Sequence, residues 1–238
     1  MFKMGAIFKR ELRSYFTGAI GYVFLVLYLT AGGAIFSFTT LFSMSADVSN
    51  FFLCMLIFSA VALPLLTMKS FSEERKIKTE QLILTSPVSI TSMVLAKFFA
   101  AYVMFASAMV ITSLYFLFLI PYATVKLGLL FGNLLALLLV GMVFISIGLY
   151  VSSLTENQLA AAVGTIAIIL AFLLVGLLSS LLPSSYWLRF VFDFFSIFTR
   201  HQGFTNGYFD IASLVYYLSI SAIFLYMTVR VYDRRRYS

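Results

Sequence analysis

Six long apolar runs, separated by short polar connections, decide what this chain can fold into. A helix needs about 20 apolar residues to cross the roughly 30 Å hydrocarbon core of a bilayer, and these runs have about that length or more. Transmembrane β-strands would instead be about ten residues long and would alternate in polarity. The sequence therefore predicts an all-α membrane protein with six transmembrane helices. The predicted spans are Gly18–Leu41, Asn50–Met68, Ser92–Ile120, Leu127–Leu154, Leu159–Leu182 and Ile211–Val229.

Lysine and arginine residues fall mostly on one side of this predicted topology. The N-terminus, the insert between the second and third spans, and the C-terminus together carry twelve, whereas the opposite connections carry three. By the positive-inside rule, both termini and the insert lie in the cytoplasm, as expected for a multi-pass protein of the cell membrane. The net charge of +7 then follows from topology, and we expect no nucleic-acid partner. Lys97 lies just inside the third span, where its ammonium group can reach the interface.

The first 17 residues are predicted to form an amphipathic helix that lies on the membrane surface. Its apolar residues fall on one side of a helical projection and its basic residues on the other, where they can meet anionic lipid headgroups. The alternative is a plain positively charged flank of the first span. The apolar side consists of Met4, Phe8, Leu12, Tyr15 and Phe16, and the membrane-surface residues are Lys3, Lys9, Arg10 and Arg13.

The insert at residues 69–91 is the most densely charged part of the chain. Ser70 followed three residues later by Glu73 forms a capping-box pattern, which predicts the start of a short helix there. The Ser86-Pro87 pair predicts its end, and Ser89 or Thr91 can cap the next span. The aliphatic stretch 82–84 (Leu-Ile-Leu) would be exposed beside these charges. Such a patch favours a docking element for a soluble partner over a passive loop.

The connection at residues 183–210 carries ten aromatic residues on the predicted outer side. Aromatic rings favour the level of the lipid headgroups, so we expect one or two helices that lie on the outer leaflet or enter it. A stabilising aromatic belt and a part in gating are both compatible with this composition. His201, the only histidine, is expected at the surface or the headgroup level rather than as a metal ligand or base.

Several kinds of chemistry are absent from the sequence. There is no Gly-x-x-x-x-Gly-Lys-Ser/Thr phosphate loop, so the chain is not expected to hydrolyse ATP itself. Cys54 is the only cysteine, which excludes an intrachain disulfide and a thiolate metal cluster. The spans hold no carboxylates of the kind that an ion-coupled transporter uses. We therefore expect no enzyme activity, no cofactor and no metal.

Several segments, taken in order, resemble the permease subunits of ABC-2 type transporters, and most closely the gliding-motility-type permease branch. The resemblance runs essentially from end to end. One departure is Lys78-Thr79, where the family often has Gly-Thr. The segments are KRELRSYF from Lys9, KSFSEERK from Lys69, LILTSPVS from Leu82, LTENQ from Leu154, and the end from Tyr216 to Arg236.

The resemblance implies one transmembrane domain over residues 1–238, with the entry helix at 1–17, a cytoplasmic coupling segment at 69–91 and short outer helices at 183–210. It implies an exporter in which two permease chains, identical or related, pair in the membrane. Each coupling helix would fit a cleft in a separate ATP-binding subunit. The alternatives are a membrane scaffold that anchors a soluble partner without transport, and a motor-independent channel. The implied coupling residues are Ser70, Phe71, Glu73, Glu74, Arg75, Leu82, Leu84, Thr85, Ser86 and Pro87.

Overall fold

The computed structural model describes residues 2–44, 47–79, 89–122, 126–181, 196, 200–201, 203 and 210–237. These residues contain helices and no strand, and six of the helices are long and apolar enough to cross a membrane. The all-α, six-span prediction is therefore confirmed. In chain order the elements are α1 (Phe2–Thr17), α2 (Ala19–Phe36), a π-helix (Ser37–Leu41), α3 (Val48–Thr67), α4 (Lys69–Lys76), α6 (Ile90–Ser113), a 3-10 helix (Leu114–Leu119), α7 (Leu127–Leu154), α8 (Gln158–Leu181) and α11 (Ile211–Tyr237).

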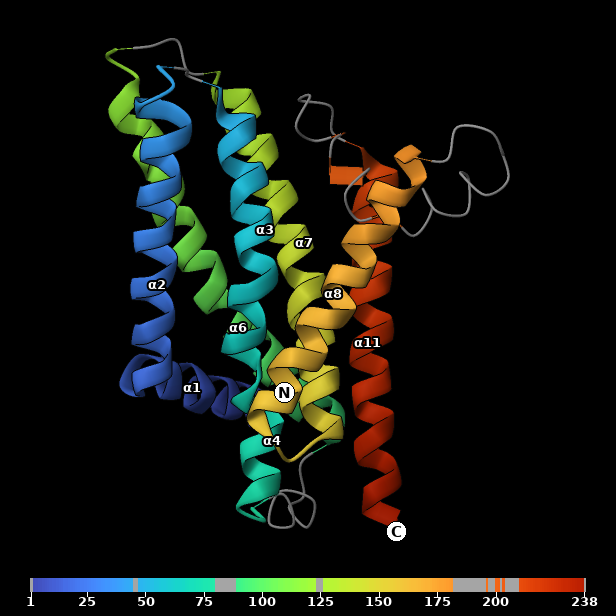
Figure 1. Cartoon of the computed structure of the whole chain (residues 1–238). Helices are drawn as coiled ribbons and strands as arrows, with labels where there is room; N and C mark the ends of the chain where they lie inside the picture. Colours follow the sequence, from blue (N-terminus) through green and yellow to red (C-terminus); the bar gives the residue numbers. More distant parts are fainter. Residues whose placement is uncertain are drawn as a thin grey trace.

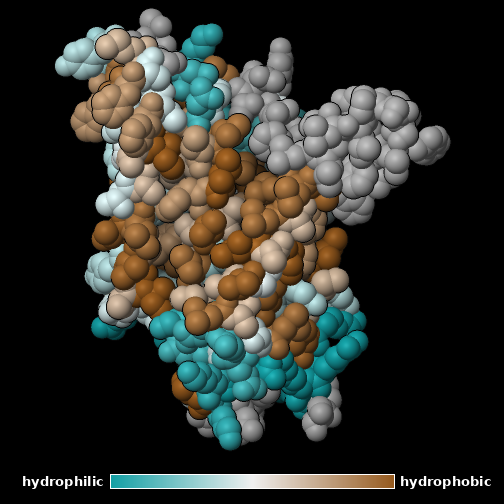
Figure 2. Space-filling model, viewed as in Figure 1, coloured by the Kyte–Doolittle hydropathy of each residue, from teal (hydrophilic) through white to brown (hydrophobic). Residues whose placement is uncertain are grey.

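The long helices stand side by side, and α1 lies across one end of them, the end at which α4 and both chain termini also lie (Figure 1). We call this the basic end, because the arginine cluster of α11 and the charges of α1 and α4 gather there. Figure 2 shows a hydrophobic belt across the middle of the face in view and a hydrophilic cap at the basic end. A belt of this kind is what contact with lipid requires.

Helix α7 is the centre of the bundle, with α3, α4, α6, α8 and α11 packed against it. Two of its glycines allow the closest approaches. A Cβ atom on Gly148 would lie 2.1 Å from Thr67 Oγ1 of α3, and one on Gly141 would lie 2.0 Å from the Phe105 ring of α6. Small residues at such crossings let helix backbones meet closely in a membrane protein.

The helix boundaries follow the predicted spans, with two informative differences. Asp47 caps α3 by accepting a hydrogen bond from the Ser49 N–H at 3.0 Å, so α3 begins before the predicted Asn50. Helix α11 continues past Val229 to Tyr237, because nothing in its basic tail breaks a helix. Ser89 caps α6 as predicted, by accepting from the Ser92 N–H.

The capping box predicted at Ser70 is wrong. Met68 connects α3 to α4 and itself has helical dihedral angles (φ −55°, ψ −33°), so α4 already begins at Lys69. Ser70 then lies inside the first turn and cannot be its N-cap. Helix α4 ends at Lys76, ten residues before the end predicted at Ser86-Pro87. Lys78 has a φ of 57°, in the left-handed region that glycine adopts most easily and that ends helices.

Two segments with sequence-based predictions fall largely outside the described residues. They are residues 80–88, which include Leu82, Leu84, Thr85, Ser86 and Pro87, and most of the aromatic connection at 183–210. His201 of that connection is described, and it is buried rather than at the surface. Burial lowers the pKa of its imidazole to about 4.

Candidate functional site

The start of α4 is held by a hydroxyl group from α7. The first N–H groups of any helix lack partners within the helix, and here the N–H groups of Phe71 and Ser72 both donate to Ser152 Oγ at 3.1 Å. The same hydroxyl donates to the Met68 carbonyl at 3.1 Å. Ser152 thus replaces the local cap that the sequence led us to expect, and it fixes the connection between α3 and α4 to the central helix.

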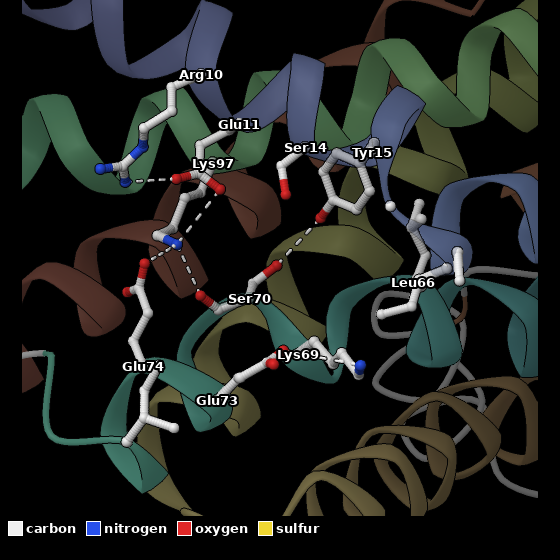
Figure 3. Close-up of a pocket in the computed structure, with 14 residues that line it drawn as sticks. Arg10, Glu11, Ser14, Tyr15, Leu66, Lys69, Ser70, Glu73, Glu74 and Lys97 are labelled. Carbon is white, nitrogen blue, oxygen red and sulfur yellow. Dashed lines mark hydrogen bonds and ion pairs between the residues drawn. The ribbon is translucent and has the colours of Figure 1, made fainter.

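Lys97 of α6 forms the centre of a charged cluster beside α4 (Figure 3). Its ammonium group donates to the Ser70 carbonyl and to Glu74 Oε1, each at 2.7 Å, and it lies 3.6 Å from Glu11 Oε2 of α1. The Lys97 side chain is only 3% exposed, while those of Glu11 and Glu74 are 16% and 20% exposed. A buried charge is stable when it is paired and hydrogen-bonded, and this one joins three helices.

The expectation that Lys97 reaches the interface stays a prediction, and the structure adds the protein partners of its ammonium group. The side chain turns inward to the two carboxylates, and its ammonium group lies 5.1 Å from the centre of the Phe71 ring. That ring is fully buried and packs against Tyr232 of α11, with ring centres 4.9 Å apart. Phe71 therefore connects the cluster to a fourth helix, α11. Its side chain packs inside the protein and is not exposed to a partner.

Two arginines hold the turn between α7 and α8. Arg75 of α4 donates to the Leu154 carbonyl at 2.8 Å, and its Nε lies 3.0 Å from Glu156 Oε1. Arg235 of α11 donates to the Ser153 carbonyl at 2.8 Å. The last carbonyls of a helix carry partial negative charge and lack partners within the helix, so cations there are favourable.

Helix α1 contacts α4 through a pair of hydroxyl groups, and it also carries a charged pair of its own. The hydroxyl groups of Tyr15 and Ser70 are 3.3 Å apart, and Arg10 donates to Glu11 at 2.7 Å. The hydrogen bond to Glu11 raises the pKa of the Arg10 guanidinium above its ordinary value. Burial raises the pKa of the Tyr15 hydroxyl to about 12. Both groups therefore keep their ordinary protonation states across the physiological range.

The outward face of α4 is open. Ile77 is 61% exposed, Lys76 is exposed, and the Glu73 side chain is 46% exposed at 3.8 Å from Lys69. The implied coupling residues therefore divide into two groups. Ser70, Phe71, Glu74 and Arg75 have contacts with other helices of the chain, whereas Glu73 is half-exposed at the edge of a cavity between α1 and α4 and pairs with Lys69 of its own helix. On α1, the predicted membrane-surface residues Lys9, Arg10 and Arg13 are exposed, and the Lys3 side chain lies outside the described set.

Sequence reasoning missed Glu11, Ser152 and the partnership of Lys97. A usable signal was present for the lysine, because an isolated cation at the end of an apolar span requires an anion at the same depth. Glu11 and Glu74 are carboxylates in the two predicted cytoplasmic segments that lie near the same end of the third span. Among the described residues, no group of three His, Cys, Asp or Glu side chains could hold a metal ion.

These contacts define an all-helical, multi-pass membrane protein in which one short helix at the basic end is tied to four others. The family model described as "ABC-2 family transporter protein" matches residues 6–235, so the chain belongs to that family. Members are typically non-enzymatic permease subunits of ABC transporters, and membership implies an ATP-binding partner in general. None of the curated proteins compared with the chain matches it. The narrower likeness to the gliding-motility-type branch stays a prediction.

Proposed function

We propose that this chain is the permease subunit of an ATP-driven exporter and that the segment 69–91 couples it to a separate ATP-binding subunit. The observation that supports this most strongly is the double character of α4. Its inner face has polar or aromatic contacts with α1, α6, α7 and α11, and its outer face is open. The basic end would be cytoplasmic by the positive-inside rule, and a second permease chain would complete the transporter.

In this proposal, a movement of the partner displaces α4, and α4 takes the other helices with it. Ser152 would transmit the displacement to α7, Lys97 would transmit it to α6 and α1, and Phe71 would transmit it to α11. Packed helices move as rigid bodies between discrete arrangements rather than deforming continuously. Nucleotide would drive the change because the ATP-binding subunit would have a different affinity for nucleotide in each of the two arrangements of the helices.

The open face of α4 has the character of a docking surface. An exposed isoleucine lies among the charged side chains of Glu73, Lys76 and Lys78. Protein interfaces commonly combine an apolar centre with a polar rim. The aliphatic residues Leu82 and Leu84 follow within the same segment of the sequence and are proposed to extend this contact.

The test is recovery of a phosphate-loop subunit with the tagged chain from native membranes in mild detergent. Ile77→Asp and the double variant Leu82→Asp/Leu84→Asp should lose that subunit, because burying a carboxylate in an apolar contact costs several kcal/mol unless it is paired. Lys9→Asp, which places a carboxylate on the exposed side of α1, is the control and should retain it.

Retention of the subunit by both docking variants at the level of the control would contradict the proposal. The recovered complex should hydrolyse ATP, and the permease chain alone should not. A soluble partner that lacks a phosphate loop would instead support the scaffold alternative.

A further inference from the structure

A polar cavity of about 520 Å³ opens at the basic end between α1, α4 and the start of α2. Figure 3 shows the labelled side chains around it, with Ser14 and Tyr15 from α1 facing Lys69, Ser70 and Glu73 from α4. The Lys97 cluster closes its inner wall. The cavity is lined by charged residues of α1 and α4 and reaches Ala19 and Ile20 at the start of the apolar helix α2.

An apolar groove of about 350 Å³ continues from this cavity between α2 and α3. Ala19 and Ile20 line both spaces, so the groove begins where the cavity ends. Its walls include Val23 and Leu27 of α2 and Val61 of α3, which are 55%, 49% and 45% exposed. The stretch from residue 19 to 27 covers about 12 Å at 1.5 Å per residue. The groove therefore extends well into the depth of one leaflet.

We infer that the cavity and the groove form one binding site for a phospholipid whose headgroup carries both a phosphate and an ammonium group. The groove holds part of one acyl chain, and the cavity holds the headgroup. An amphiphile is the ligand that matches a polar cavity at the edge of the belt joined to an apolar groove within it.

The charges of the cavity select the headgroup. Its lining contains three cations and three carboxylates, namely Arg10, Lys69, Lys97, Glu11, Glu73 and Glu74. Lys97 is already paired with two carboxylates and Arg10 with Glu11. Lys69 and Glu73 remain at the mouth, 3.8 Å apart and partly exposed. The phosphate would meet Lys69 and the ammonium group would meet Glu73. A purely anionic headgroup that bound Lys69 would leave the Glu73 carboxylate beside it without a cation.

The site is tested with the full chain in detergent, by native mass spectrometry with added phosphatidylethanolamine or phosphatidylglycerol. The wild type should retain phosphatidylethanolamine preferentially. Val61→Trp fills the groove and should reduce retention about tenfold. Val26→Trp, at a somewhat more exposed valine of α2 outside the groove, should not. Lys69→Ala should weaken retention about fivefold, and Lys76→Ala on the same helix should leave it unchanged.

Leu27→Trp fills the groove from α2 instead of α3. It replaces Val61→Trp in the test if that variant is not monodisperse. Equal retention by the groove variants and the Val26→Trp control would overturn the site, and preference for phosphatidylglycerol would overturn the assigned headgroup. The experiment needs no ATP-binding subunit. Its result is therefore independent of the coupling proposal.

Discussion

At the scale of single residues, the Lys97 ammonium group holds α1, α4 and α6 together at the basic end. This group is nearly inaccessible to water, and three acceptors from α1 and α4 replace its hydration. The desolvation of a buried ion is offset only while its partners are in place. Losing the lysine would leave Glu11 and Glu74 facing each other across a poorly solvated space.

Lys97→Met should lower the free energy of unfolding by about 3 kcal/mol, the usual cost of removing one member of a buried ion pair. Adding Glu74→Gln should recover part of the loss, because it removes one of the stranded carboxylates. Thermal unfolding in detergent measures both effects. Lys69→Met is the control, and its loss should stay below about 1 kcal/mol because its pair with Glu73 is partly exposed. Equal losses at the two lysines would contradict the account.

At the scale of elements, α4 keeps its position through its two ends. Ser152 supplies the hydrogen bonds at the start, and a left-handed residue terminates the helix at Lys78. A substitution that disrupts either end should therefore change the stability of the helix.

Ser152→Ala should destabilise the chain by about 1 to 2 kcal/mol, because the N–H groups of Phe71 and Ser72 lose their partner in a buried place. Amide exchange should rise at Phe71 and Ser72. The adjacent Ser153 is equally buried, but its hydroxyl donates only to the Tyr150 carbonyl of its own helix. Ser153→Ala should therefore stay within about 0.5 kcal/mol of the wild type. Unchanged exchange in α4 of Ser152→Ala would refute the capping role.

Lys78→Gly should leave the melting temperature unchanged or raise it slightly, because glycine adopts a φ of 57° without a steric penalty. Lys78→Val should lower stability by about 1 kcal/mol or more, since a β-branched residue is strained in that region. Calorimetry of the purified variants separates the two. A melting temperature for Lys78→Val equal to that of Lys78→Gly would show that the left-handed conformation is not required there.

At the scale of the whole molecule, both termini and α4 lie at the basic end, and the turn after the 3-10 helix lies at the other. Cysteines introduced by Lys78→Cys and Tyr122→Cys, in a Cys54→Ser background, should label from opposite sides of the membrane. Both positions are exposed in the structure. A membrane-impermeant maleimide should reach residue 122 in intact cells and residue 78 only after the cells are opened. Labelling of both in intact cells would contradict the cytoplasmic placement of α4.

The sequence was sufficient for features that depend on one segment at a time. Span length and apolarity predicted six helices, and Ser89, which caps α6, was one of the two caps predicted for that helix. It was insufficient for features that join distant segments. Ser152 caps α4 from about 80 residues away, and Lys97 finds Glu11 and Glu74 through helix packing. No local pattern encodes such pairs, because their geometry exists only after the spans have assembled.

The central claim is that the open face of α4 contacts the ATP-binding subunit, and site-specific photo-cross-linking in native membranes tests it most directly. A photoreactive amino acid at position 77 should give one main cross-linked product, and mass spectrometry should identify the attached protein by its phosphate loop. The same group at position 9 on α1, at the same end of the molecule, should not give that product. Capture of the subunit from position 9 with none from position 77 would contradict the claim.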